Sequence, residues 1–163
     1  MIVINSSPAI NLTAVLGGLD LLVDLYGPVI VPLEVFQELE AGASKDSTAL
    51  RLRETHGIEI REQLIEIPLL LGNLLDLGEA AVIQTALEEG ISTVILDDLK
   101  GRRSARLAGL EIIGSLGVLV QVKRVGRLVS VAEAIERLKA RGTWMDRNVV
   151  ERALQLAGEA TEK

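Results

Sequence analysis

Short runs of β-branched residues alternate along this chain with longer segments of helical apolar spacing, and this alternation most constrains the fold. The runs 2–4, 29–31, 93–96 and 111–113 have the length and composition of buried strands. Alternating isoleucines within 58–67 predict further extended pieces at the edge of a sheet. Because strands that alternate with helices are joined by crossover connections, we expect a parallel sheet and an α/β fold.

The segments between these runs predict helices with identifiable starts and stops. We expect serine after the first run to cap a helix with Pro8 in its first turn, and Asp76 to cap a later helix. Gly17-Gly18 divides the first helical segment into two. The apolar spacing predicts helices over 10–16, 19–25, 32–42, 44–56, 76–87, 102–107, 131–140 and 146–157.

The length of 163 residues is enough for one domain with its own core, which we place at residues 1–125. Residues 126–163 are expected to form a helical extension that packs either on the same domain or on a partner subunit. Exposed apolar faces on its two predicted helices would favour association, so we expect a homodimer.

Residue usage excludes several kinds of site. The chain has no cysteine and one histidine, His56, so it has neither disulfides nor the ligands of a zinc site. It lacks the basic start and apolar run of a signal peptide, and no apolar stretch approaches the roughly 20 residues that span a bilayer. We therefore expect a cytoplasmic protein without a membrane segment.

Five polar residues fall at strand ends or on the helices that follow them: Asn5, Glu38, Glu79, Asp97 and Asp98. Ligand groups of open parallel sheets collect beyond the carboxyl ends of the strands, so we expect these side chains to lie together. Clustered carboxylates repel one another and lose hydration, which favours a hard cation such as Mg²⁺ or Mn²⁺ among them. Taken singly, Asp97 and Asp98 also suit a turn and a helix cap, and Glu79 suits the positive end of a helix dipole.

Positive charge is concentrated after these acids, although the net charge of the chain is −6. Residues 99–127 contain seven lysines and arginines against one acid. Lys100, Arg102 and Arg103 are candidate RNA-binding residues; the alternative is that these charges only cover solvated helix faces. Aromatic residues make up 2% of the chain and Trp144 is expected to pack the tail, so RNA binding would rest on charge and shape.

Four ordered motifs resemble PIN domains. They are Ile2-Val-Ile-Asn-Ser-Ser-Pro-Ala-Ile10, Pro32 with Glu38-Leu39, Leu77-Gly-Glu-Ala-Ala-Val-Ile83, and Leu96-Asp-Asp-Leu-Lys-Gly-Arg-Arg103. The resemblance covers residues 1 to about 125 and is closest to a prokaryotic PIN-like branch with a Ser-Ser-Pro start and an Asp-Asp-x-x-Gly-Arg-Arg loop. It implies a three-layer α/β/α fold with a parallel central sheet and, beyond it, a helical C-terminal extension.

PIN domains are typically Mg²⁺- or Mn²⁺-dependent ribonucleases, and they include VapC-like toxins of toxin–antitoxin pairs. The resemblance therefore implies RNA as the substrate and an antitoxin protein as a partner. The positions that match the family's acids and small hydroxyl residues are Glu38, Glu79, Asp97 or Asp98, Ser6 and Ser7.

The chain departs from the family pattern at two positions. Asn5 stands where the family has its first aspartate, and Ala81 stands where members of this branch often carry a second acid. An amide keeps an oxygen that can bind a cation but removes a full charge. We therefore expect a metal-dependent endoribonuclease, by analogy a toxin, with a weakened site. The alternative is a catalytically inactive module that binds RNA or an antitoxin.

Overall fold

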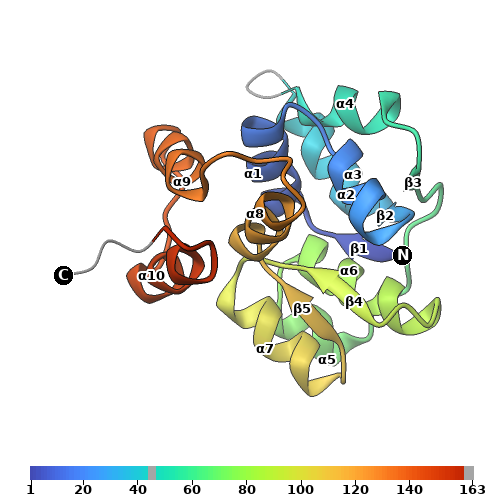
Figure 1. Cartoon of the computed structure of the whole chain (residues 1–163). Helices are drawn as coiled ribbons and strands as arrows, with labels where there is room; N and C mark the ends of the chain where they lie inside the picture. Colours follow the sequence, from blue (N-terminus) through green and yellow to red (C-terminus); the bar gives the residue numbers. More distant parts are fainter. Residues whose placement is uncertain (44–46, 160–163) are drawn as a thin grey trace.

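The computed structural model describes residues 1–43 and 47–159, and its strands form a single parallel sheet (Figure 1). The strands lie in the order β3-β2-β1-β4-β5. Their bounds are β1 (Ile2–Ile4), β2 (Val29–Val31), β3 (Ile58–Ile60), β4 (Thr93–Ile95) and β5 (Glu111–Ile113). The predicted α/β fold with a parallel central sheet is confirmed.

Burial follows the position of each strand in the sheet. Every residue of β1 and β2 is buried, whereas the edge strands β3 and β5 are partly exposed. Continuous β-branched runs suit central strands because helices cover them on both faces. Residues 65–67 form no strand, since the Ile65 amide donates to the Glu34 carboxylate (2.7 Å) and Pro68 follows.

The helices of the described residues are α1 (Ser6–Leu16), α2 (Asp20–Tyr26), α3 (Leu33–Ala41), α4 (Thr48–Glu54), α5 (Leu69–Leu74), α6 (Leu77–Glu88), α7 (Leu99–Leu107), α8 (Ser115–Arg124), α9 (Val131–Ala140) and α10 (Arg147–Leu156). The sequence patterns did not predict α5; for α8 they indicated only a strand-to-helix turn at Gly114, without a range for the helix. Helix α7 begins before the predicted Arg102 because Asp98 caps it through the Lys100 amide (2.7 Å). Part of the predicted helix 44–56, residues 44–46, lies outside the described residues.

The caps at the two helix starts near the candidate site differ. Asp76 accepts a hydrogen bond from the Glu79 amide (2.8 Å), as predicted for α6. The predicted serine cap of α1 is wrong, because Ser6 is already the first helical residue and Asn5 occupies the cap position. The Asn5 side chain makes no capping hydrogen bond. The side-chain amide of Asn5 is therefore free to take part in other contacts.

Helices cover both faces of the sheet in three layers (Figure 1). Helices α1, α2, α4 and α8 pack on one side, while α6 packs on β1 and β4 and also contacts α5 and α7 on the other. Helix α3 contacts α1, α4 and α6. Within the described residues no single helix is long and apolar enough to cross a membrane; α1 and α2 pass that test only as a pair bent by 110°.

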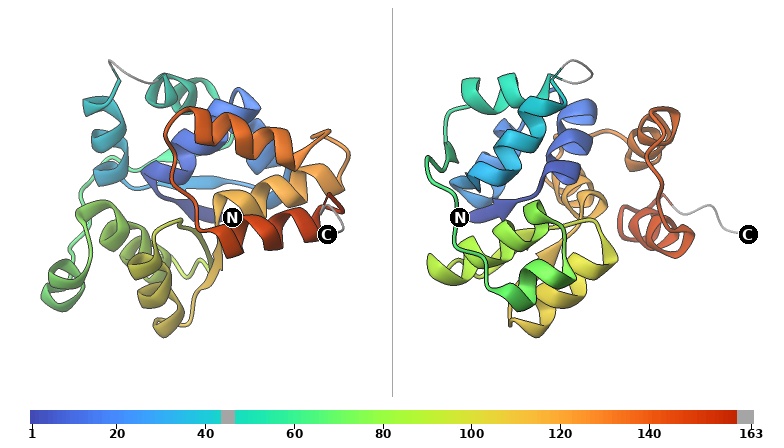
Figure 2. Two further views of the ribbon diagram at one scale, coloured as in Figure 1. Left: turned by 90° about the vertical axis from the view of Figure 1, so that its left-hand side faces the viewer. Right: turned by 180° about the vertical axis from the view of Figure 1, so that it is seen from behind.

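The C-terminal helices lie against the rest of the chain (Figure 2). Helix α9 contacts α1 and α8, and α10 contacts α8 and α9. Helix α9 buries an apolar face, and Glu159, just after α10, accepts hydrogen bonds from the Val131 and Ala132 amides at its start (2.7 and 2.8 Å). Lys123 of α8 donates to the same carboxylate. One partly buried acid thus joins α8, α9 and the end of α10.

Candidate functional site

The strand order reverses between β1 and β4, and the candidate residues begin at this point. The backbone N–H of Asn5, just after β1, donates to the Ile95 carbonyl at the end of β4 (3.2 Å). In open parallel sheets this switch point is where the connections diverge and leave room for a ligand. The Asn5 side chain is 7% exposed, and its Oδ1 has no hydrogen-bond partner.

Glu38 of α3 approaches Asn5 over Gly78 of α6. A Cβ atom at Gly78 would lie 3.0 Å from both Asn5 Oδ1 and Glu38 Oε2. These two oxygens therefore lie no more than about 6 Å apart, since both are close to one point. Any larger residue at 78 would displace them, so the Gly-Glu opening of α6 provides space for oxygens as well as a helix start.

Glu79, the next residue, is buried against α7. It is 3% exposed, and its Oε1 would lie 2.7 Å from a Cβ atom at Gly101. Burial, together with the nearby negative charges of Asp76 and Asp98, raises the pKa of Glu79 to about 7. A hydrogen bond with Asp98 also favours the protonated form of Glu79. As a carboxylate, Glu79 has one buried oxygen, Oε1, without a hydrogen-bond partner. Glu79 is thus held among acids at an energetic cost.

Asp97 lies in a different environment from Asp98. Its Oδ1 accepts from the Ser115 amide (2.7 Å), and its Oδ2 accepts from Ser115 Oγ (2.5 Å) and Asn11 Nδ2 (3.1 Å). Asn11 Oδ1 in turn accepts from Thr143 Oγ1 in the loop between α9 and α10 (3.2 Å). Asp97 therefore ties β4 to α1, α8 and the C-terminal extension, whereas Asp98 is exposed and adjoins Glu79.

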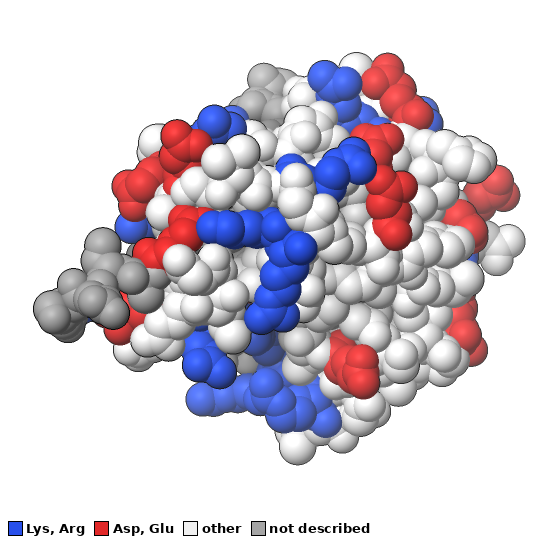
Figure 3. All heavy atoms as spheres, in the orientation of Figure 1, with Lys and Arg blue, Asp and Glu red and all other residues white. Residues whose placement is uncertain are grey.

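The candidate RNA-binding residues lie on α7 and at the start of α1. Lys100 and Arg103 are exposed on α7, and Arg102 is partly exposed with its Nη1 beside Gly114. Ser7 is exposed at the start of α1, but Ser6 is buried. Figure 3 shows lysines and arginines over α7 and α8.

Most of these basic residues are available to an external anion. Of the basic residues in 99–127, only Lys123 forms an ion pair within the described part of the chain, and its partner is Glu159. Unpaired arginines next to the acids that follow the strand ends suit contacts with phosphate oxygens. The face therefore carries local positive charge despite the net charge of −6.

Sequence reasoning missed several residues of this region. Glu34 is 5% exposed with Oε2 unpartnered, and its other oxygen fixes the Ile65 amide. Its place one helical turn before Glu38 was a signal that both carboxylates share one side of α3. No local pattern marked Asn11 or Ser115 as partners of Asp97, because both come from distant segments.

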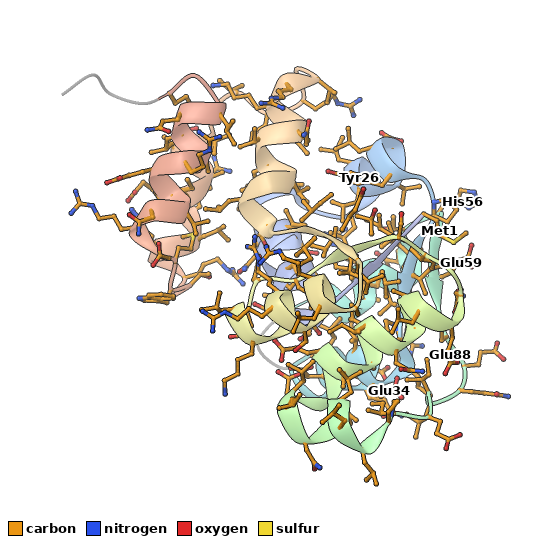
Figure 4. The ribbon with its side chains drawn as sticks, turned by 90° about the horizontal axis from the view of Figure 1, so that it is seen from below. Met1, Tyr26, Glu34, His56, Glu59 and Glu88 are labelled. Atoms are coloured by element: carbon orange, nitrogen blue, oxygen red, sulfur yellow. The ribbon has the colours of Figure 1, made fainter. Side chains whose placement is uncertain are left out.

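Two residues lie apart from the acids. His56 and Met1 lie just before β3 and β1, at the amino ends of the strands and thus opposite the candidate site (Figure 4). Trp144 is 83% exposed, so the expectation that it packs the tail is wrong. Two surface hollows of about 240 and 400 Å³ also lie elsewhere, one between α2 and α8 and one between α3 and the end of β3.

The oxygen atoms at this site suit a hard cation. Asn5 Oδ1 and Glu79 Oε1 are buried without partners, and Glu38 and Asp98 adjoin them. Such a set of carboxylate and amide oxygens matches the preference of Mg²⁺ or Mn²⁺. Within residues 1–43 and 47–159, however, no three acidic, histidine or cysteine side chains already form a metal-binding cluster. Ala81 is fully buried. The buried position at which related chains often carry a second acid on α6 therefore holds a methyl group here.

Comparison with known proteins identifies the family. A family model of PIN domains, DUF3368, matches residues 1–159 and therefore includes α9 and α10. A search of curated proteins found no match. PIN domains have a nuclease-type fold and generally use divalent metal ions, which agrees with the carboxylate and amide oxygens after the strand ends. Because the match spans nearly the whole chain, this protein belongs to the PIN domain family.

Proposed function

We propose that this PIN domain is a metal-dependent endoribonuclease. The observation that carries the proposal is the buried Glu79 carboxyl, which adjoins Asp76 and Asp98 and has an unpartnered oxygen. A fold gains nothing from such repulsion unless a ligand relieves it, and a divalent cation is the ligand that acidic oxygens bind. Asn5 and Glu38 would complete the oxygen set.

Each residue has a distinct role in this proposal. Glu38, Glu79 and Asp98 would hold Mg²⁺ or Mn²⁺, and Asn5 would add a neutral oxygen. The cation would stabilise charge that develops on the phosphate during phosphodiester hydrolysis. Asn5 cannot accept a proton near neutral pH, so the proton of the attacking water would pass to one of the carboxylates or to solvent. Asp97 would act as a positioning residue, since its oxygens already accept from Ser115 and Asn11.

RNA is the proposed substrate because a basic face adjoins the acids. Lys100, Arg102 and Arg103 follow Asp98 directly on α7 and make no ion pair within the described part of the chain. These side chains would hold phosphates on either side of the scissile bond, and Ser7 would add a hydroxyl donor. Binding of this kind weakens as salt rises.

The test is cleavage of an end-labelled RNA with Mn²⁺ or with EDTA. We expect cleavage only with Mn²⁺, and a loss of about 100-fold or more for Glu79→Gln and Asp98→Asn. Asp97→Asn is the matched control: at a temperature where it is folded, it should lose less activity than Asp98→Asn. Equal losses in the two aspartate variants would contradict the roles assigned to them.

A second candidate is the inactive module that binds RNA or an antitoxin. Asn5, Ala81 and the lack of a three-acid cluster in the described residues favour it. An inactive parent whose Asn5→Asp variant cleaves RNA with Mn²⁺ would support this alternative and overturn the enzyme proposal. The toxin role, the antitoxin, the homodimer and a cytoplasmic location remain parts of the proposal supported by the family resemblance or by residue composition.

A further inference from the structure

We propose that Trp144 stacks on an unpaired base of single-stranded RNA beside the acidic site. This inference deepens the proposed function and rests on it for RNA as the ligand. Trp144 lies in the loop between α9 and α10, outside the motifs that resemble other PIN domains. It would give the site a base contact that charge alone does not provide.

The exposure of Trp144 sets it apart from the other aromatic residues. The chain has one Trp, one Tyr and one Phe. Phe36 is 4% exposed and Tyr26 is half-buried, whereas Trp144 is 83% exposed. Tryptophan is highly buried on average because its large indole is costly to leave in water. A chain that covers its other rings wholly or in part and exposes this one presents an aromatic surface to a partner.

The loop holds Trp144 outward between two anchored neighbours. Thr143 donates to Asn11 through its hydroxyl and to the Leu138 carbonyl through its amide (3.2 and 3.0 Å). Met145 packs against the hydrophobic core. Since the residues on both sides face inward, the backbone at Trp144 is held in place and its indole faces solvent. A restrained loop backbone loses less conformational freedom when the ring binds.

The same anchor places the residue before Trp144 close to the acids. Thr143 reaches Asn11, and Asn11 reaches the Asp97 carboxylate through the other atom of its amide (3.2 and 3.1 Å). The Thr143 hydroxyl therefore lies within about 9 Å of Asp97, given the size of an amide group. Asp98, the proposed cation ligand, is the next residue. One or two nucleotides of extended RNA span this separation.

The charges near this path favour a nucleic acid over an apolar partner. Arg102 Nη1 and Asp97 Oδ1 both lie within 3.3 Å of the Cβ position of Gly114. Arg102 thus lies close to Asp97, which is joined through Asn11 to Thr143 in the loop. Stacking suits any base, because every base has a π face, while the arginine suits the phosphate. The expected ligand is single-stranded RNA without strong sequence preference.

The experiment uses the fluorescence of the one tryptophan in the full chain. The protein is titrated in EDTA, where the proposed cleavage is absent, with a ten-nucleotide oligouridine and with duplex RNA of equal length. We expect saturable quenching by the single strand and little by the duplex, whose bases are already stacked. Quenching that is equal for both RNAs would overturn the proposal.

Variants separate stacking from a general effect on the surface. By polarisation of labelled oligouridine, Trp144→Ala should weaken binding by about 10-fold, and Trp144→Phe should retain most of the affinity. Thr143→Val should weaken binding less than Trp144→Ala, because it loosens the loop but keeps the ring. The matched control is Leu69→Ala on α5, whose side chain is 85% exposed, and it should leave binding unchanged.

The outcomes distinguish this inference from the proposed nuclease. Cleavage with Mn²⁺ but no change of fluorescence on RNA binding would overturn stacking and leave the nuclease intact. Quenching by single strands without cleavage would support stacking and overturn the nuclease. Absence of both would overturn both. Tryptophan fluorescence that changes on protein dilution but not on addition of RNA, together with a dimer in sedimentation, would show that a second copy of the chain covers Trp144. That result would overturn stacking.

Discussion

Two adjacent carboxylates after β4 lie in opposite environments. Asp97 accepts three hydrogen bonds from Ser115 and Asn11 and joins four parts of the fold. One residue later, Asp98 adjoins Glu79, whose pKa is raised by burial and by its acidic neighbours. The first carboxylate is satisfied by donors of the protein itself, whereas the second belongs to a group of acids short of donors.

This difference separates structural acids from candidate ligand-binding acids. A carboxylate surrounded by donors stabilises the fold and has little capacity left for a cation. A buried carboxyl among other acids costs stability until a cation or a proton joins it. Spacing along the chain cannot distinguish the two cases, since the residues are adjacent. Each prediction below changes one side of the comparison.

The largest effect should come from removing the satisfied carboxylate. Asp97→Ala leaves Ser115 and Asn11 without their acceptor and should lower the free energy of unfolding by about 4 kcal/mol. Asp98→Ala is the matched control and should change it by less than about 1 kcal/mol, because this exposed side chain loses one capping contact. Urea denaturation of both variants provides the measurement. Similar losses for the two would remove the basis of the comparison.

The second effect concerns Glu79 in the absence of metal. A carboxyl whose pKa is raised from 4.5 to about 7 carries no penalty below pH 4.5, and the full penalty develops as pH rises through 7. Glu79→Gln should therefore stabilise the protein by about 3 kcal/mol at pH 8 in EDTA, and by little at pH 4.5. Thermal unfolding against pH tests this. A stabilisation that does not depend on pH would show that charge is not the cause.

The smallest effect should come from Glu159, a satisfied acid in the extension. Burial opposes its ionisation, but hydrogen bonds from Lys123, Ala132, Val131 and Ser130 lower its pKa to about 2. The stability it contributes is present above pH 4.5 and is lost as pH falls toward 2. Glu159→Gln should cost about 1 kcal/mol at pH 7, since partial exposure to solvent reduces the effect, and almost nothing near pH 2.

Metal provides a check on the whole comparison. If the Glu79 pocket binds Mn²⁺, adding Mn²⁺ at pH 8 should raise the melting temperature of the parent and should have much less effect on Glu79→Gln. Asp97 makes its contacts within the protein, so Asp97→Asn should retain the response to Mn²⁺ despite a lower melting temperature. A parent that shows no response at millimolar Mn²⁺ would count against the metal site.

Local patterns were sufficient to predict much of the fold and the edge of the sheet at which the candidate residues follow their strands. β-branched runs marked the strands, and Asp76 marked the start of α6. The convergence of Asn5 and the Asp97-Asp98 pair followed from where strands end. The patterns failed at the serine cap of α1, at 65–67 and at Trp144. In the last two cases the outcome depends on contacts with residues far away in the chain.

The sequence by itself determined that a parallel sheet forms and that polar residues meet at its carboxyl edge, because strand length, side-chain alternation and helix caps are local properties. Only the tertiary structure decided which of Asp97 and Asp98 faces Glu79. The partners of Asp97 come from α1 and α8, and Asn11 meets Thr143 across 132 positions. Hydrogen bonds between such distant segments depend on how the layers pack, and that packing also leaves Trp144 exposed.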